Sequence, residues 1–344
     1  MARIALIYPG QGAQHAGMGR EFFDAYESVR ARFAECSELL SEDMEALCFT
    51  ENDRLDETQY TQPAMVLMEL ALTEVVKREL GMADRYGQAA AGAEQARQEN
   101  AAADGSCSVS CSAGLSLGEY AAIAEAGAMS FADAIRTVAL RGKLMAEAVP
   151  SGEGAMAAVL GLSAEQIEAV IAPIDGAYIA NYNCPGQIVI TGARAAVEQA
   201  SAALSEAGAR KCVPLKVSGP FHSPLLSEAG RKLGAALESV QFSAPEHPYL
   251  ANVTAEAVSD EAEIRELLTK QVSSSVRWQQ SVEAMLSDGV DTFIEIGPGK
   301  TLAGFMRKIL KDYAAKSGAD VSAVRTFSVE TPEDLEKLKA ALSQ

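Results

Sequence analysis

An α/β fold with a parallel core sheet is predicted for this chain of 344 residues. Arg3–Pro9 is a short apolar run closed by glycines, as in a buried parallel strand. Helical periodicity follows in residues 21–40 and returns in residues 63–80, where one face is apolar. Between Gly154 and Lys216 the order of strand and helix patterns changes, which predicts a smaller domain inserted into the first.

The larger domain is expected to comprise residues 1–152 and 218–316 and to be α/β-hydrolase-like. Residues 107–113 are very small, which is typical of a central strand crowded on both faces. Residues 81–105 are rich in Ala, Gly and Gln and predict an inserted helix or surface excursion without catalytic groups. Residues 317–344 are expected to form a C-terminal tail.

Residues 153–217 are expected to form a small ferredoxin-like α+β domain. Their patterns follow the order strand, helix, strand, strand, helix, strand of a ferredoxin-like split unit. The expected elements are Ala155–Leu160, Ala164–Ile174, Tyr178–Asn183, Gln187–Thr191, Ala193–Ala207 and Lys211–Lys216.

Composition excludes several classes of function. A net charge of -18 makes nucleic acid and anionic membranes poor partners. The opening apolar run, Ile4–Tyr8, is too short for a signal peptide or a membrane span. Six cysteines show no disulfide-like framework, and three histidines give no zinc spacing. We therefore expect a cytoplasmic protein without a metal.

A candidate nucleophile follows the small-residue strand. Gly114-Leu115-Ser116-Leu117-Gly118 has the G-x-S-x-G pattern of a nucleophile elbow, which exposes a serine hydroxyl at a helix N-terminus. The alternative is an ordinary N-cap serine between glycines. Such a nucleophile needs a base. His222 lies in a rigid Gly-Pro-Phe-His-Ser-Pro turn, whereas His247 lies in a segment that reads as an exposed loop and His15 follows the first glycine turn.

Five motifs occur in one order along the chain. They are Pro9-Gly10-Gln11-Gly12-Ala13-Gln14, Gly114-x-Ser116-x-Gly118-Glu119-Tyr120, Asn181-x-Asn183-x-Pro185-Gly186-Gln187, Gly219-Pro220-Phe221-His222-Ser223 and Glu295-x-Gly297-Pro298-Gly299-Lys300. Together they resemble the malonyl-CoA:acyl carrier protein transacylase family, and they are also similar to the acyltransferase domains of polyketide and fatty acid synthases. The resemblance covers residues 4–311.

The resemblance implies a Ser-His dyad. Ser116 attacks the thioester of malonyl-CoA and His222 takes its proton. The backbone N–H groups of Gln11 and Leu117 form the oxyanion hole, and the main-chain carbonyl of Gln271 orients the histidine. No cofactor is implied.

The implied reaction transfers malonyl to a phosphopantetheinylated acyl carrier protein, which is the expected partner of a monomeric enzyme. Phe221 before His222 is similar to the malonyl-selective branch of the family. Leu115 departs from the family, which commonly has His immediately before the serine. Three alternatives stay open: an acyltransferase serving a polyketide synthase, a serine thioesterase or hydrolase, and an inactive carrier-binding scaffold. A serine hydrolase would have a late histidine in its chain order, and none follows His247.

Arg141 is a candidate carboxylate ligand on independent grounds. It falls on the apolar stripe of the predicted helix at residues 133–149, where a guanidinium needs a partner. An internal ion pair or a snorkelling side chain is the alternative. The resemblance favours binding of the malonyl carboxylate by Arg141, and it carries Asn181 and Asn183 over as contacts to the pocket or to the carrier arm.

The last cationic stretch suggests a docking surface. Carrier proteins of the resembled family are acidic, so an acidic enzyme needs a local basic patch to attract them. Arg307 and Lys311 are four residues apart on a predicted helix, with Lys300 and Lys308 nearby. A solvated helix end is the alternative.

Overall fold

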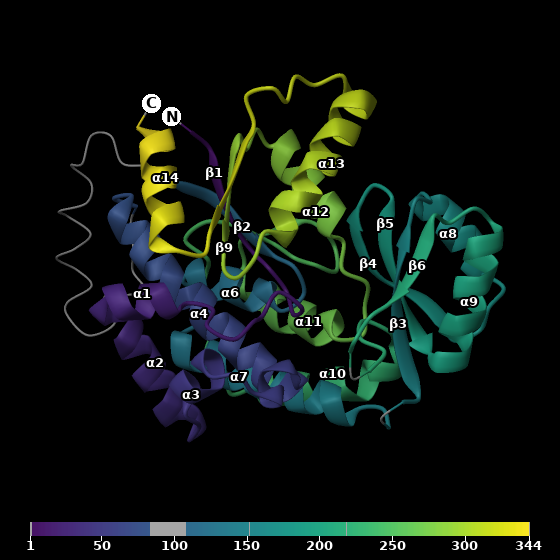
Figure 1. The fold of residues 1–344 in the computed structure, drawn as a ribbon, viewed down its shortest axis with the longest axis horizontal. Coiled ribbons are helices and arrows are strands. Elements are labelled where there is room, and N and C mark those ends of the chain that lie inside the picture. Colours follow the sequence, from purple (N-terminus) through teal and green to yellow (C-terminus); the bar gives the residue numbers. More distant parts are fainter. Residues whose placement is uncertain (1, 83–107, 151, 218, 344) are drawn as a thin grey trace.

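The computed structural model describes residues 2–82, 108–150, 152–217 and 219–343, and the predicted insertion at 81–105 lies almost wholly outside them (Figure 1). Within these ranges the strands form a six-stranded sheet, in the order β10-β9-β1-β2-β7-β8, and a four-stranded sheet, in the order β4-β5-β3-β6. The larger sheet contains β1 (Ile4–Tyr8), β2 (Val109–Gly114), β7 (Tyr249–Leu250), β8 (Ala257–Val258), β9 (Thr292–Ile296) and β10 (Arg325–Val329).

The larger sheet is parallel except for β8, and helices cover both of its faces. Alternation along β1 explains this, because Ile4, Leu6 and Tyr8 pack against one group of helices while Ala5 and Ile7 pack against another. The first group is α1 (Arg20–Ala25), α2 (Glu27–Leu40), α3 (Met44–Phe49), α4 (Thr58–Glu79), α6 (Gly118–Glu125), α7 (Phe131–Glu147), α10 (Ser227–Leu237), α11 (Glu261–Gln271) and α14 (Pro332–Leu342). The second is α12 (Trp278–Ser287) and α13 (Thr301–Ser317).

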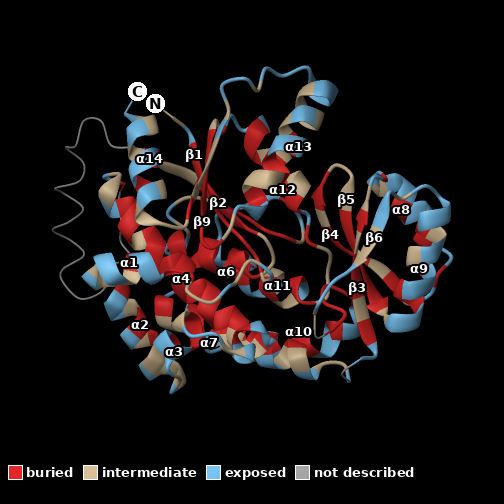
Figure 2. Ribbon diagram, viewed as in Figure 1, coloured by how far each residue is buried: buried red, intermediate tan, exposed pale blue. Residues whose placement is uncertain are grey.

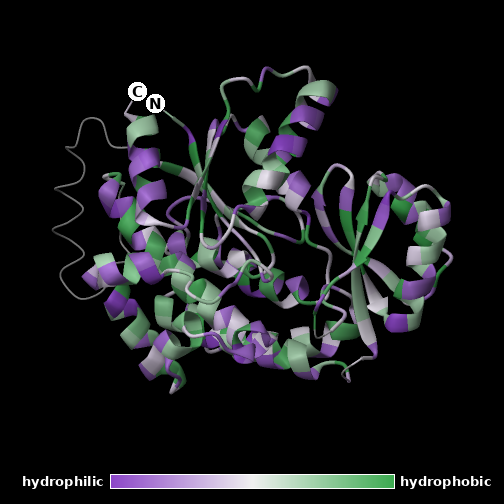
Figure 3. Cartoon of the chain, viewed as in Figure 1, coloured by the Kyte–Doolittle hydropathy of each residue, from purple (hydrophilic) through white to green (hydrophobic). Residues whose placement is uncertain are grey.

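Burial and hydropathy follow this layering. Figure 2 shows the buried residues concentrated in the central strands and in α4. In Figure 3 hydrophobic residues recur along the strands of the large sheet, and hydrophilic residues gather on the outer faces of the helices. The predicted α/β fold with a parallel core sheet is therefore confirmed.

The second sheet is antiparallel and packs one face on two helices. Its elements are β3 (Gly154–Leu160), α8 (Ala164–Ile171), β4 (Ala177–Cys184), β5 (Gln187–Ala193), α9 (Arg194–Glu206) and β6 (Lys211–Pro214). The chain segment at Val276 joins it to the large part: the Val276 N–H donates to Ala180 O at 2.7 Å, and the Tyr182 N–H donates to Val276 O at 2.9 Å.

The expectation that residues 317–344 form a C-terminal tail is wrong. Strand β10 pairs in parallel with β9, and α14 packs Leu335 and Leu338 into the main core. Thr331 and Asp334 form a capping box that starts α14. The C-terminal segment therefore completes the edge of the large sheet, because a further parallel strand buries the backbone groups of β9.

Candidate active site

Ser116 lies in the turn between β2 and α6, with a φ of 54°. Residues other than glycine rarely adopt this left-handed backbone conformation, which is typical of a strained nucleophile elbow. The flanking glycines are required because a Cβ on Gly114 would lie 1.8 Å from the carbonyl carbon of Gly118. A Cβ on Gly118 would lie 2.4 Å from Tyr8 O at the end of β1. The serine is thereby presented at the carboxyl ends of the parallel strands, ahead of the N-terminus of α6.

His222 is placed to accept the proton of this serine. Its Nε2 lies 2.7 Å from Ser116 Oγ, and its Nδ1 lies 2.9 Å from the main-chain oxygen of Gln271. Since a carbonyl can only accept, Nδ1 carries the proton and Nε2 presents a lone pair to the serine. Burial, followed by the positive charge of Arg141, lowers the pKa of His222 to about 4. The imidazole is therefore neutral at neutral pH, as a base must be.

Arg141 projects from α7 into the same space and is 1% exposed. Its Nη2 donates to Ser116 Oγ at 3.1 Å and to Gln271 Oε1 at 2.9 Å, and its Nη1 donates to Gln62 Oε1 at 2.9 Å. The guanidinium also lies over the ring of Tyr120 at 5.3 Å. These three acceptors are neutral oxygens, so a buried positive charge lies next to the nucleophile with no carboxylate of the described residues hydrogen-bonded to it.

A cavity of about 220 Å³ lies in front of Ser116, and its wall combines loops and helices of the larger part with strands β3, β4 and β5 of the small sheet. It is lined by the predicted oxyanion-hole residues Gln11 and Leu117 and by Arg141, Ser116 and His222. Its other predicted lining residues are Asn181, Asn183 and Phe221. Gln271 lies behind His222 rather than at the cavity wall. The structure thus brings all of the residues predicted for the site together.

Three polar residues hold the site from behind and had no assigned role in the sequence: Asn252, Glu119 and Gln62. Asn252 Oδ1 accepts from the Ser116 N–H at 2.7 Å. Glu119 is 1% exposed, and burial raises the pKa of its carboxyl to about 7. Only Gln62 carried a signal, as a polar residue near the start of a strongly apolar helix.

The two other histidines lie elsewhere. His247 is not in an exposed loop as expected: its Nε2 lies 2.9 Å from Oε2 of the buried Glu125, whose other oxygen accepts from Lys77 Nζ at 2.9 Å. His15 Nε2 lies 2.6 Å from Glu330 Oε1. Both rings therefore join distant segments of the fold rather than serving Ser116.

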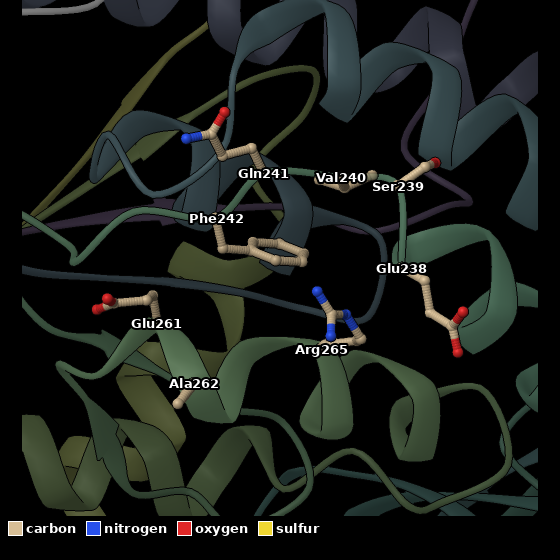
Figure 4. Close-up of a pocket in the computed structure, with 8 residues that line it drawn as sticks. All are labelled: Glu238, Ser239, Val240, Gln241, Phe242, Glu261, Ala262 and Arg265. Carbon is tan, nitrogen blue, oxygen red and sulfur yellow. The ribbon is translucent and has the colours of Figure 1, made fainter.

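A second hollow, of about 440 Å³, lies between the end of α10 and the start of α11 (Figure 4). Arg265 projects into it, and its Nε donates to Leu237 O at 3.1 Å. The lining residues include no serine–histidine or cysteine–histidine pair, so catalytic chemistry belongs to the cavity at Ser116.

Within 2–82, 108–150, 152–217 and 219–343, no group of three or more His, Cys, Asp or Glu side chains is arranged to hold a metal ion. No helix in those ranges combines the length and apolar character needed to cross a membrane.

This chain is similar in sequence and in fold to known acyltransferases. The family described as "Acyl transferase domain" matches residues 5–86 and 88–343. The malonyl CoA-acyl carrier protein transacylase of Bacillus subtilis is 38% identical over 98% of this chain and 96% of the relative, and that of Escherichia coli K12 is 37% identical over 94% and 98%.

Solved structures agree. An acyl carrier protein S-malonyltransferase from Vibrio cholerae is 35% identical with a TM-score of 0.85, covering 98% of this chain and 100% of that one. A malonyl-transacylase in complex with its type II PKS acyl-carrier protein is 33% identical with a TM-score of 0.84, and both chains are covered completely. The chain therefore belongs to the acyl transferase domain family, among the malonyl CoA-acyl carrier protein transacylases.

Proposed function

We propose that this chain transfers a malonyl group from malonyl-CoA to a holo acyl carrier protein through a malonyl ester on Ser116. One observation carries the proposal: Ser116 Oγ lies 2.7 Å from a neutral imidazole nitrogen of His222 and 3.1 Å from the guanidinium of Arg141. A nucleophile, a base and a carboxylate receptor are thus within one small cavity. The names of the relatives support the same reaction.

The mechanism follows from these contacts. His222 Nε2 takes the Ser116 proton as Oγ attacks the thioester carbonyl, while the N–H groups of Gln11 and Leu117 bind the developing oxyanion. The tetrahedral intermediate expels the CoA sulfur, which receives the proton from His222. The carrier thiol then enters, gives its proton to His222 and attacks the ester, and Oγ regains a proton as it leaves. Arg141 holds the malonyl carboxylate in a bidentate pair throughout.

The test is the covalent intermediate. Wild-type protein mixed with malonyl-CoA should gain a malonyl adduct by intact mass, located on the peptide that contains Ser116. The Ser116→Ala variant should fold and gain no adduct, and an undiminished adduct there would overturn the proposal. Discharge of the isolated adduct then separates the alternatives. Rapid discharge by holo carrier protein supports transfer, equal discharge by water indicates a thioesterase, and a wild type without any adduct indicates an inactive scaffold.

We infer that the carrier protein approaches over α13. On this helix Thr301 and Phe305 line the cavity, and Lys308 on the same face reaches Gln187 Oε1 at 3.5 Å. Arg307 instead lines a separate hollow with Lys300 and Lys337. Lys308 is therefore better placed beside the cavity than Arg307, and the solved complex of a related transacylase with its carrier protein supports a protein partner.

Finer features of the fold remain proposals. Order β4-β5-β3-β6 supports a ferredoxin-like description for residues 153–217. The elbow at Ser116 supports a hydrolase-like description for residues 1–152 and 218–316. A monomeric state stays a prediction, which sedimentation of the purified chain would check.

A further inference from the structure

Both main-chain polar groups of Ser116 are held by side chains from distant parts of the chain. The Ser116 N–H donates to Asn252 Oδ1 at 2.7 Å, and Asn252 Nδ2 donates to Gly114 O at 2.7 Å. The Ser116 carbonyl accepts from Gln271 Nε2 at 2.7 Å. Two amide side chains therefore brace an elbow whose backbone is in an unfavourable conformation.

Glu119 is the common partner of the two braces. Its Oε1 accepts from the main-chain N–H of Asn252 at 3.2 Å, and its Oε2 accepts from Gln271 Nε2 at 2.7 Å. Glu119, Asn252 and Gln271 are each at most 1% exposed, so water does not substitute for these bonds. One carboxylate in the first turn of α6 thus joins the loop after β7 to the end of α11.

The direction of these hydrogen bonds fixes the orientation of Gln271. Its Oε1 accepts from Arg141 Nη2 at 2.9 Å, so its Nε2 must face Glu119 and Ser116 O. Its main-chain oxygen meanwhile holds His222 Nδ1. Glu119 Oε2 therefore acts together with Arg141 and Ser116 O to hold this amide in one orientation. The same residue orients the base through its main-chain oxygen.

We propose that Glu119 is a positioning residue: through Gln271 and Asn252 it sets the mutual geometry of Ser116, His222 and Arg141 without touching the reacting atoms. This inference rests on the proposed function in that Ser116 and His222 are taken as nucleophile and base. Both groups that Glu119 binds are donors, so its role requires two acceptor oxygens and not only a side chain of this size.

The decisive variant is Glu119→Gln. It keeps the shape of the side chain but turns an NH₂ group toward one of the two donors, so one brace is lost. The matched control is Glu69→Gln in α4. Glu69 is 0% exposed, its two oxygens have no hydrogen-bond partner among the described residues, and it does not line the cavity. Both variants make the same chemical change in a buried place.

Three readouts on the full chain separate positioning from folding. These are the melting temperature, kcat and KM for malonyl transfer, and the rate at which a fluorophosphonate, a serine-directed probe without a carboxylate, labels Ser116. Since small displacements of reacting groups can cost about 100-fold, Glu119→Gln should lose roughly 10- to 100-fold in kcat and in labelling rate, with little change in KM. Glu69→Gln should keep wild-type values.

Equal kcat and labelling rates in the two variants would overturn the inference, as would a loss in Glu119→Gln that only matches its unfolded fraction. If Glu119→Gln does not fold, Glu119→Asp replaces it, because it keeps the carboxylate but shortens the side chain by one methylene and so withdraws both acceptor oxygens from the Asn252 N–H and Gln271 Nε2. Normal labelling of that variant would refute the bracing role. A wild type that is labelled by the fluorophosphonate but never by malonyl-CoA would instead contradict the proposed function, and the comparison of labelling rates would still test Glu119.

Discussion

Removal of the guanidinium by Arg141→Ala should abolish the preference for a substrate with a carboxylate. Arg141 is 1% exposed and its hydrogen bonds go to neutral oxygens of Gln62, Ser116 and Gln271. A malonyl carboxylate would therefore supply a directly bonded counter-charge, which no described residue provides. Loss of one partner from a buried ion pair costs about 3–5 kcal/mol. At about 1.4 kcal/mol per tenfold, kcat/KM for malonyl-CoA should fall roughly 140- to 3,700-fold.

The assay compares malonyl-CoA with acetyl-CoA in the same variant. Acetyl has no carboxylate, so its transfer should be kept or should rise. A second signature follows from electrostatics, because the charge of Arg141 lowers the pKa of His222. In Arg141→Ala that pKa should rise, and the acidic limb of acetyl transfer should move to higher pH. Equal losses of malonyl and acetyl transfer, with an unmoved acidic limb, would mark Arg141 as structural and refute the reasoning.

Three further predictions concern the base, its pH dependence and the docking surface. His222→Ala should slow acylation by about 10²–10⁴-fold, whereas His247→Ala should leave the acylation rate near wild type and lower only the melting temperature; two variants with the same acylation rate would contradict the assignment of the base. In the wild type, acylation should be lost only as the pH falls through about 4, where His222 gains its proton, and should be flat above about pH 5. For docking, Lys308→Glu should raise KM for the carrier protein and weaken its salt dependence more than Arg307→Glu does, with acylation by malonyl-CoA unchanged in both; equal KM values in the two variants would place docking elsewhere.

The sequence was sufficient to predict the features that depend only on residues close together in the chain. The strand at residues 4–8 and the elbow at Ser116 depend on apolar alternation and on two glycines, which are visible within a few residues. The burial of Arg141 was predictable because the periodicity of one helix places it on the apolar stripe. These features need no knowledge of tertiary contacts.

The remaining parts of the site depend on contacts between distant segments. Asn252 reaches Ser116 across 136 residues, and no local pattern distinguishes it from a turn-forming asparagine. The pairing of His247 with Glu125 spans 122 residues and could not be read from a Pro-Glu-His-Pro loop. Strand β10 and helix α14, in the segment expected to be a tail, were missed for another reason. Residues 325–329 alternate polar and apolar only weakly, and their partner β9 lies 33 residues earlier. The capping signal at Thr331-Pro332-Glu333-Asp334 was present and would have identified α14.

The backbone of the dyad has a consequence for the evolution of this chain. Ser116 and His222 both have positive φ, at 54° and 59°, in a conformation that costs a non-glycine residue about 1–2 kcal/mol. Glycine at either position would relieve that cost and remove the side chain on which catalysis depends. Selection for thermal tolerance alone would therefore favour glycine at these two positions, so their retention in a stabilised variant would itself be a record of selection for activity.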